Sequence, residues 1–307
     1  MIVDCYTHIW ESPGQLGRVV EALRRHSRVP SGRGVGDQEP RANVTRHFAA
    51  SKAADATIVV GFKSEYLGAD ISNDTVADYV KTHPERLIGF AGIDPTNRAA
   101  ALEEIDRATS ELCMKGIAIS PAAQDLHPSS SNMEAVYEHA ESLGLPVMFH
   151  QGIQISSECK LEYAQPVLLD AVAREYPKLK IIIAHLGYPW ISEALVLLGK
   201  HSNVYSDISW LLHQPWEAYQ ALLSAYQYGV MDKLLFASGF PFNSATESIE
   251  TLYGLNHLCA GTNFPRIPRE ALRGIVECDA ISRLGIRHEA PRSTTPSEIT
   301  AEDGANA

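Results

Sequence analysis

Short apolar segments rich in β-branched residues recur along the chain, and segments of helical length separate them. Eight such apolar segments span residues 2–8, 56–62, 87–94, 116–120, 147–152, 181–187, 204–209 and 234–241. Between them apolar residues recur at helical spacing. In 132–143, for example, Met133, Val136 and Ala140 share one face and Gly144 ends the helix. Strands that alternate with helices indicate βαβ units and a parallel sheet.

The polar residues decide between a closed barrel and an open sheet. They follow nearly every predicted strand instead of gathering at one point where the strand order would reverse. Further helices are predicted over 75–83, 98–111, 167–176 and 218–228. We therefore expect residues 1–286 to form a single parallel (β/α)8 barrel, the TIM-barrel architecture of the α/β class.

Two segments do not fit the repeating pattern. The stretch between the first two strands is rich in Gly, Arg and Pro, and we expect a lid loop over 28–46. The tail at 287–307 is rich in Ser, Thr, Glu and Ala without apolar periodicity, so we expect it to be disordered.

Composition narrows the classes of partner. The 307 residues are 45% hydrophobic and carry a net charge of -11 without a Lys/Arg-rich run, which argues against nucleic-acid binding. We see no apolar run long enough to span a membrane and no signal peptide, and we expect a cytoplasmic protein. The five scattered cysteines should be reduced, and only Cys159 is a candidate reactive thiol in a loop.

Candidate catalytic side chains stand at the C-terminal ends of the predicted strands, where such barrels place their reactive groups. Tyr6 and His8 share a face of the first strand because side chains alternate with a period of two. The fifth strand ends at His150, the sixth at His185 and the seventh at Asp207. Three histidines at corresponding positions of different strands predict a reaction site at one mouth of the barrel.

Several segments together resemble the amidohydrolase superfamily, in the branch related to aminocarboxymuconate-semialdehyde decarboxylase. They are 2–10, 86–95, 115–117, 147–152, 184–190 and 236–241, and the likeness runs from Ile2 to Ile286. The resemblance implies a metal-assisted hydrolase or a non-oxidative decarboxylase that acts on small organic acids or ring compounds.

The resemblance also implies a metal site, of which this chain keeps only part. The family pattern has His-x-His on strand 1, a His on strand 5, a catalytic His on strand 6 and an Asp on strand 8. His8, His150 and His185 match, whereas Tyr6 replaces the first His and Gly239 replaces the Asp. A catalytic zinc normally needs three protein ligands and an open position. We therefore expect no tightly held catalytic metal and predict no cofactor.

The substrate-binding residues are predicted from the same strand ends. Ser120 stands where relatives often carry a His after strand 4. Trp190, Trp210 and Phe242 follow strands 6 to 8 and could wall an aromatic pocket. His213, just past strand 7, is interpreted as a solvated residue but is the remaining histidine most worth placing in three dimensions.

Three functions stay open. In the first, a metal-independent enzyme performs a lyase, isomerase, cyclase or dehydratase step on a small carboxylated or ring-containing metabolite, with His185 moving the proton and Asp207 orienting an imidazole. In the second, Tyr6, His8, His150 and Asp207 hold zinc or manganese in an unusual hydrolase or decarboxylase. In the third, a catalytically silent barrel binds a small molecule or a partner protein. A homodimer is compatible with all three.

Overall fold

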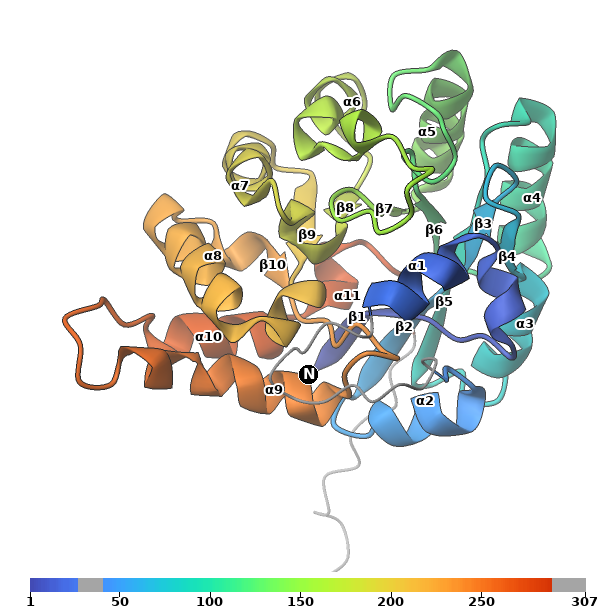
Figure 1. Cartoon of the computed structure of the whole chain (residues 1–307). Helices are drawn as coiled ribbons and strands as arrows, with labels where there is room; N and C mark the ends of the chain where they lie inside the picture. The colour runs from blue at the N-terminus through green and yellow to red at the C-terminus, as the bar shows by residue number, and fades with distance from the viewer. Residues whose placement is uncertain (27–40, 289–307) are drawn as a thin grey trace, which may run out of the picture.

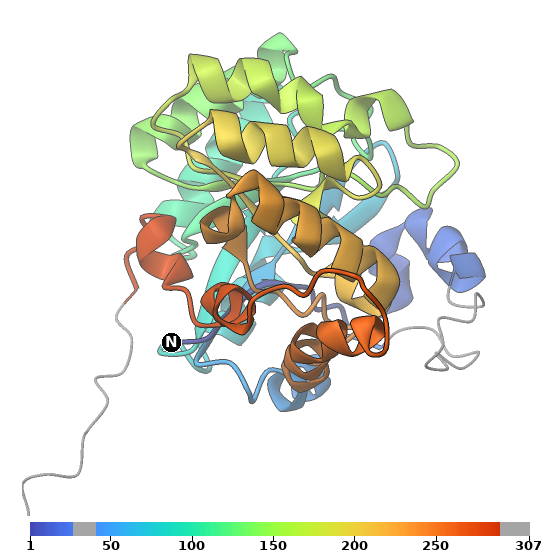
Figure 2. The same cartoon turned by 90° about the vertical axis from the view of Figure 1, so that its left-hand side faces the viewer.

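The computed structural model describes residues 1–26 and 41–288. Eight parallel strands form one sheet in the order β1-β2-β5-β6-β7-β8-β9-β10, and helices surround it (Figures 1 and 2). The strands of this sheet are β1 (Val3–Thr7), β2 (Ala56–Val60), β5 (Leu87–Gly92), β6 (Gly116–Ile119), β7 (Val147–Phe149), β8 (Ile181–Ile183), β9 (Val204–Asp207) and β10 (Leu234–Leu235). The predicted (β/α)8 barrel is confirmed.

The last and first strands close the barrel through the backbone that follows the short β10. The Cys5 amide donates to the Phe236 carbonyl at 2.9 Å, and the His8 amide donates to the Phe240 carbonyl at 3.0 Å. The Gly239 amide donates to the Tyr6 carbonyl at 3.1 Å. These bonds place residues 236–240 beside the C-terminal end of β1, where the predicted site lies.

The helices alternate with the strands. They are α1 (Val19–His26), α2 (Val44–Ala50), α3 (Asn73–Val80), α4 (Arg98–Ser110), α5 (Ser131–Leu143), α6 (Leu169–Glu175), α7 (Ile191–Lys200), α8 (Pro215–Tyr228), α9 (Ala245–Gly254), α10 (Arg269–Val276) and α11 (Ala280–Arg283). In α5 the predicted face of Met133, Val136 and Ala140 is buried, and Gly144 ends the helix with φ +69°. A left-handed residue at this place favours glycine.

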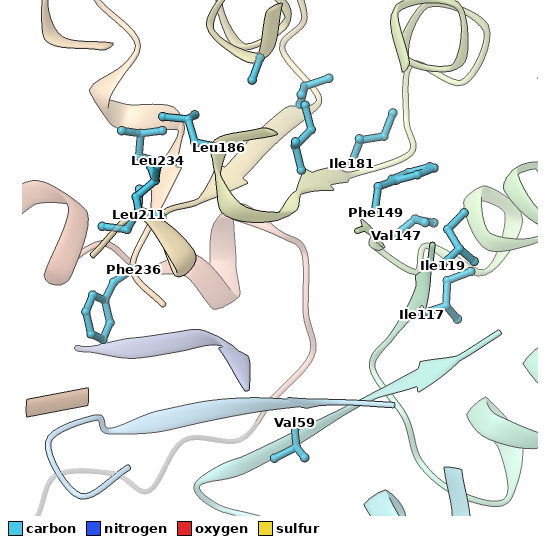
Figure 3. Packing of buried hydrophobic residues seen from close by; sticks show 14 of the residues in the cluster. Val59, Ile117, Ile119, Val147, Phe149, Ile181, Leu186, Leu211, Leu234 and Phe236 are labelled. Atoms are coloured by element: carbon cyan, nitrogen blue, oxygen red, sulfur yellow. The ribbon is translucent and has the colours of Figure 1, made fainter. Parts of the chain in front are cut away.

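Alternation along the strands divides the buried side chains between two clusters. Ile117, Phe149 and Ile181 pack with the helices, and Figure 3 shows their side chains beside one another. Their strand neighbours Met148 and Ile182 belong to a second cluster, which also contains residues of α11. Both faces of a barrel strand are therefore buried, which explains the nearly continuous apolar runs in the sequence.

Two expectations between the first strands need correction. The second strand ends at Val60, and a two-stranded antiparallel hairpin, β3 (Phe62–Ser64) with β4 (Ala69–Ile71), follows it. Most of the predicted lid at 28–46 lies outside the described residues, but 44–46 begin helix α2 because Asn43 caps that helix by accepting from the Arg46 amide. The predicted disordered tail lies almost wholly outside the described residues.

Candidate active site

A pocket lies at the C-terminal ends of the barrel strands, with an empty volume of about 930 Å³ that includes part of the open solvent at its mouth. Its polar residues include Tyr6, His8, His150 and His185, which come from β1 and from the ends of β7 and β8. Aromatic and aliphatic side chains form the rest of its wall, among them residues of α1 and of the β3–β4 hairpin. The three histidines and Tyr6 thus converge on one pocket.

The Tyr6 ring contacts the rings of all three histidines. The Tyr6 ring centroid lies 4.9 Å from that of His8 and 4.8 Å from that of His185, and both contacts are edge-to-face. The rings of His150 and His185 are 5.1 Å apart. Tyr6 therefore lies at the centre of the cluster and can reach a ligand that also touches His185.

His8 and His150 are uncharged in this environment. Burial lowers the pKa of His8 to about 4, although a hydrogen bond to the Val60 carbonyl partly offsets the effect. Burial also lowers the pKa of His150 to about 4. The Nδ1 of His8 donates to the Val60 carbonyl oxygen at 2.7 Å, so its Nε2 carries the lone pair. The Nε2 of His150 is buried and has no hydrogen-bond partner among the described residues.

His185 is held from behind by a serine and an aspartate. Its Nδ1 lies 2.6 Å from the Ser209 hydroxyl, and that hydroxyl is in short contact with Oδ1 of Asp207. An ionised Asp207 can only accept, so the hydroxyl donates to it and accepts from Nδ1–H of His185. The Trp210 amide also faces Nδ1, at a longer 3.4 Å. We assign the tautomer from the shorter contact, which leaves Nε2 of His185 as an acceptor.

Asp207 anchors this chain of hydrogen bonds. Its Oδ1 also accepts from the amides of Ser209 at 3.0 Å and His185 at 3.1 Å, while Oδ2 has no partner among the described residues. Burial raises the pKa of Asp207 to about 6, although these hydrogen bonds offset part of the effect. Asp207 is therefore a carboxylate at neutral pH. It stabilises the turn by accepting from the Ser209 amide, and it is linked to the His185 imidazole through the Ser209 hydroxyl.

His185 and Tyr6 are both uncharged at neutral pH, but the imidazole can accept a proton whereas the phenol can donate one. Burial, and after it the neighbouring His150, lowers the pKa of His185 well below its usual range. Burial, and after it the negative charge of Asp207, raises the pKa of Tyr6 far above its usual range. At neutral pH the site therefore holds an uncharged imidazole beside an intact phenol, which is a base next to a donor.

Gly239 occupies the position where the resemblance implied an aspartate, and the space beside it is filled. Its φ is +71°, a conformation that L side chains rarely adopt, and an added Cβ would lie 3.2 Å from Cβ of Ser209. Ser209 thus packs against the place from which the missing carboxylate would project.

The described side chains of the pocket do not form a ready-made cluster of metal ligands. Within residues 1–26 and 41–288, no three His, Cys, Asp or Glu side chains are placed to hold one ion. The phenol of Tyr6 resists ionisation because it is buried near Asp207. Zinc prefers three neutral or anionic protein donors, and the imidazoles of His8, His150 and His185 are of the right kind but are not placed around one ion. Manganese prefers oxygen donors, and no carboxylate lines the pocket among the described residues.

The other predicted site residues divide into two groups. Ser120, Trp210 and Phe242 line the pocket, whereas Trp190 does not. Between β8 and Trp190 the residues His185 and Leu186 adopt left-handed conformations, so the extended strand does not continue to Trp190.

Three further residues bear on the site. His213 lines the pocket and is not the solvated residue that its position suggested. Cys159 also lies in the wall, but burial raises the pKa of its thiol to about 11, so it is a poor nucleophile. Ser209, the direct partner of His185, was missed because a serine two residues after a strand is usually a turn residue.

A model of the amidohydrolase family matches residues 3–276. The chain belongs to this family. A 2-amino-3-carboxymuconate-6-semialdehyde decarboxylase of Dictyostelium discoideum is 23% identical over 134 residues. This match covers 39% of the chain and 37% of that relative, so the chain spans little more than a third of its length in the alignment.

Solved structures share the family fold. An uncharacterized TIM-barrel protein of Bordetella bronchiseptica has a TM-score of 0.69 and 18% identity, with 92% of this chain and 99% of that chain covered. A 5-carboxyvanillate decarboxylase of Novosphingobium aromaticivorans, complexed with manganese and 4-hydroxy-3-methoxy-5-nitrobenzoic acid, has a TM-score of 0.65 and 14% identity, with 93% and 96% covered. At these identities the likeness shows the fold. Within the described residues, no helix is long and apolar enough to cross a membrane.

Proposed function

We propose that the chain is an enzyme that transfers a proton on a small ring-containing substrate without a resident metal, in a lyase, isomerase, cyclase or dehydratase type of reaction. The observation that carries this proposal is the hydrogen-bonded series from His185 through Ser209 to Asp207, which ends at an imidazole in the pocket wall. Its fixed tautomer gives that imidazole a free lone pair inside a largely apolar pocket.

The reaction would begin with Nε2 of His185 as the base. It would take a proton from carbon or oxygen of the substrate, and the positive charge that forms on the ring would be stabilised by Asp207 through Ser209. Tyr6, 4.8 Å away between ring centroids, would donate its phenolic proton or a hydrogen bond to the atom that gains negative charge. The lone pair on Nε2 of His8 could accept from a substrate hydroxyl.

Deuterium exchange tests this proposal even while the product is unidentified. The protein would be incubated with a panel of ring compounds in D2O, and NMR would follow deuterium incorporation and product formation. We expect exchange with the wild-type protein and its loss in His185→Gln and Tyr6→Phe, while the control Trp190→Phe retains it because Trp190 does not line the pocket. Full activity in both site variants would overturn the proposal.

A metal-dependent decarboxylase is the second candidate, and two of the similar proteins, which are themselves decarboxylases, favour it. Under this alternative Tyr6, His8, His150 and Asp207 would supply the ligands. Elemental analysis after dialysis, followed by chelation and metal restoration, separates the two functions. One equivalent of zinc or manganese that is retained, and whose removal abolishes turnover reversibly, would replace the first proposal by the second.

A further inference from the structure

The pocket wall has an unusual charge pattern for a site that would bind organic acids. Among the described residues, no Arg, Lys, Asp or Glu lines it. The polar side chains are hydroxyls, amides, imidazoles and one thiol, carried for example by Ser120, Gln154 and Ser156. We infer that this site selects an uncharged ring compound that bears a hydroxyl or carbonyl oxygen, and that it discriminates against the corresponding carboxylate. The inference rests on the proposed function for the place of the reaction and adds the class of substrate.

An anion in this pocket would lack a compensating charge. Moving a carboxylate out of water is unfavourable unless a cation or several donors pair with it. Among the described residues the wall offers imidazoles but no Arg or Lys, the side chains that carry a permanent positive charge. Asp207, behind His185, adds a negative charge close to the pocket floor and opposes a second anion.

Unpartnered polar atoms indicate what the ligand does carry. Ser120 Oγ and His150 Nε2 are both buried and have no hydrogen-bond partner among the described residues, although both residues line the pocket. A buried polar atom without a partner is unfavourable, so a ligand hydroxyl that reaches either atom recovers free energy on binding, and a ligand carbonyl oxygen can do so by accepting from Ser120. An uncharged hydroxyl or carbonyl oxygen supplies this contact without the cost of burying a charge.

The aromatic side chains of the pocket wall suit a flat ring as the ligand. Trp210 and Phe242 meet edge-to-face with centroids 5.4 Å apart, and both line the pocket. Aromatic walls favour flat apolar ligands through burial of area and through edge contacts. The walls and the unpartnered atoms thus both point to a ring with an uncharged oxygen substituent.

Matched ligand pairs test the inference by calorimetry on the full chain. The pairs are resorcinol with 2,6-dihydroxybenzoate, and guaiacol with vanillate, whose members differ by one carboxylate. We expect the uncharged member to bind about ten-fold more tightly or better at neutral pH, given the cost of an unpaired anion. The acid should bind only in its protonated form, so its apparent affinity should fall about ten-fold per pH unit above its own pKa. Equal or tighter binding of the carboxylates, or no binding of either uncharged ring up to its solubility limit, overturns the inference.

A charge introduced into the wall provides the matched control. Gln154 lines the pocket, and its amide nitrogen makes a long hydrogen bond of 3.5 Å to the His150 carbonyl. Gln154→Arg should raise the affinity for the carboxylates about ten-fold, since a guanidinium can form charge-assisted hydrogen bonds with a carboxylate. Gln154→Met should leave the preference for the uncharged rings intact. If Gln154→Arg does not improve carboxylate binding although it folds and binds resorcinol, missing charge is not the reason for the discrimination.

The outcome is separable from that of the proposed function. In His185→Gln the preference for uncharged rings should persist while deuterium exchange is lost. Selective binding of uncharged rings without exchange in the wild-type protein would leave the inference standing and refute the proposed chemistry. Deuterium exchange that occurs only on carboxylates would support the proposed chemistry and refute the inference about the substrate class.

Discussion

Two buried histidines, His47 and His185, show how the same side chain serves the fold in one place and the site in another. His47 lies on α2 behind β1, where its Nε2 is 2.9 Å from the Thr7 hydroxyl and its Nδ1 is 2.9 Å from the Tyr79 hydroxyl. Thr7 donates its own proton to the Ile58 carbonyl at 2.7 Å, so it accepts from Nε2–H of His47. Both nitrogens of His47 are therefore used within the fold.

Among the described residues, the hydrogen bonds of the His185 ring involve only Nδ1. Its Nδ1 is fixed by Ser209, and its ring lines the pocket. Burial lowers the pKa of His185 as it does that of His47, which is brought to about 4. A perturbed pKa therefore does not separate the two histidines. The two histidines differ at Nε2, which binds Thr7 in His47 and is available to a ligand in His185.

The largest effect is expected from removing the base itself. His185→Gln should lower kcat by about 10²–10⁴, the range that a positioned general base contributes. His47→Gln, the matched control at a buried histidine outside the pocket, should lower kcat less than about ten-fold because its ring does not reach the substrate. Steady-state turnover of the compound found by deuterium exchange gives both numbers. Similar losses in the two variants would erase the distinction between these histidines.

Stability should respond in the opposite order, with the larger loss expected from replacing His47. His47→Leu leaves the hydroxyls of Tyr79 and Thr7 without their buried partner, which should lower the free energy of unfolding by about 2–4 kcal/mol. His185→Gln should cost less, since within the described residues only Nδ1 of its ring makes hydrogen bonds. Denaturant unfolding measures both values. Tyr79→Phe in the His47→Leu background should restore part of the loss because it removes one of the unpartnered groups; no recovery would show that the bond to Tyr79 contributes little.

The barrel and its histidines could be predicted because their signals repeat. Apolar strand segments recur eight times, and His8, His150 and His185 follow the same kind of strand end, which a barrel brings to one mouth. Ser209 carries no such signal, since its importance comes from the Asp207 turn that aims its hydroxyl at His185.

Short or unusual backbone explains the other misses. The strands of the β3–β4 hairpin have three residues each, too few for a visible alternation. Trp190 follows a turn whose left-handed residues could not be foreseen from a sequence without glycine at those positions. His47 lies just past the stretch interpreted as a lid, where helix α2 is only seven residues long.

The pH dependence of turnover should report the protonation of Asp207, which is linked to His185 through Ser209, and we expect an effect of intermediate size. Because burial raises the pKa of Asp207 to about 6, the carboxylate is present above that pH and is lost as the pH falls through it. Turnover should then fall about ten-fold per pH unit below 6, since the neutral acid no longer stabilises a protonated His185. Asp207→Asn should be slow and lack this limb of the pH–rate profile. A limb that survives in Asp207→Asn would assign the titration to another group.

The smallest expected effect concerns the packing that holds Ser209 in place beside His185. Gly239→Ala puts a Cβ 3.2 Å from Cβ of Ser209 at a φ of +71°, which should lower the free energy of unfolding by about 1–2 kcal/mol. Gly239→Asp should show at least the same cost, because its Cβ meets the same contact with Ser209, and it should still retain no metal through dialysis. Ser209→Gly in the Gly239→Ala background relieves the contact but not the backbone conformation, so it should recover only part of the loss. A Gly239→Asp protein that is as stable as the wild type and holds one equivalent of zinc would mean that Ser209 yields readily, and that His185 is less firmly fixed than its contacts indicate.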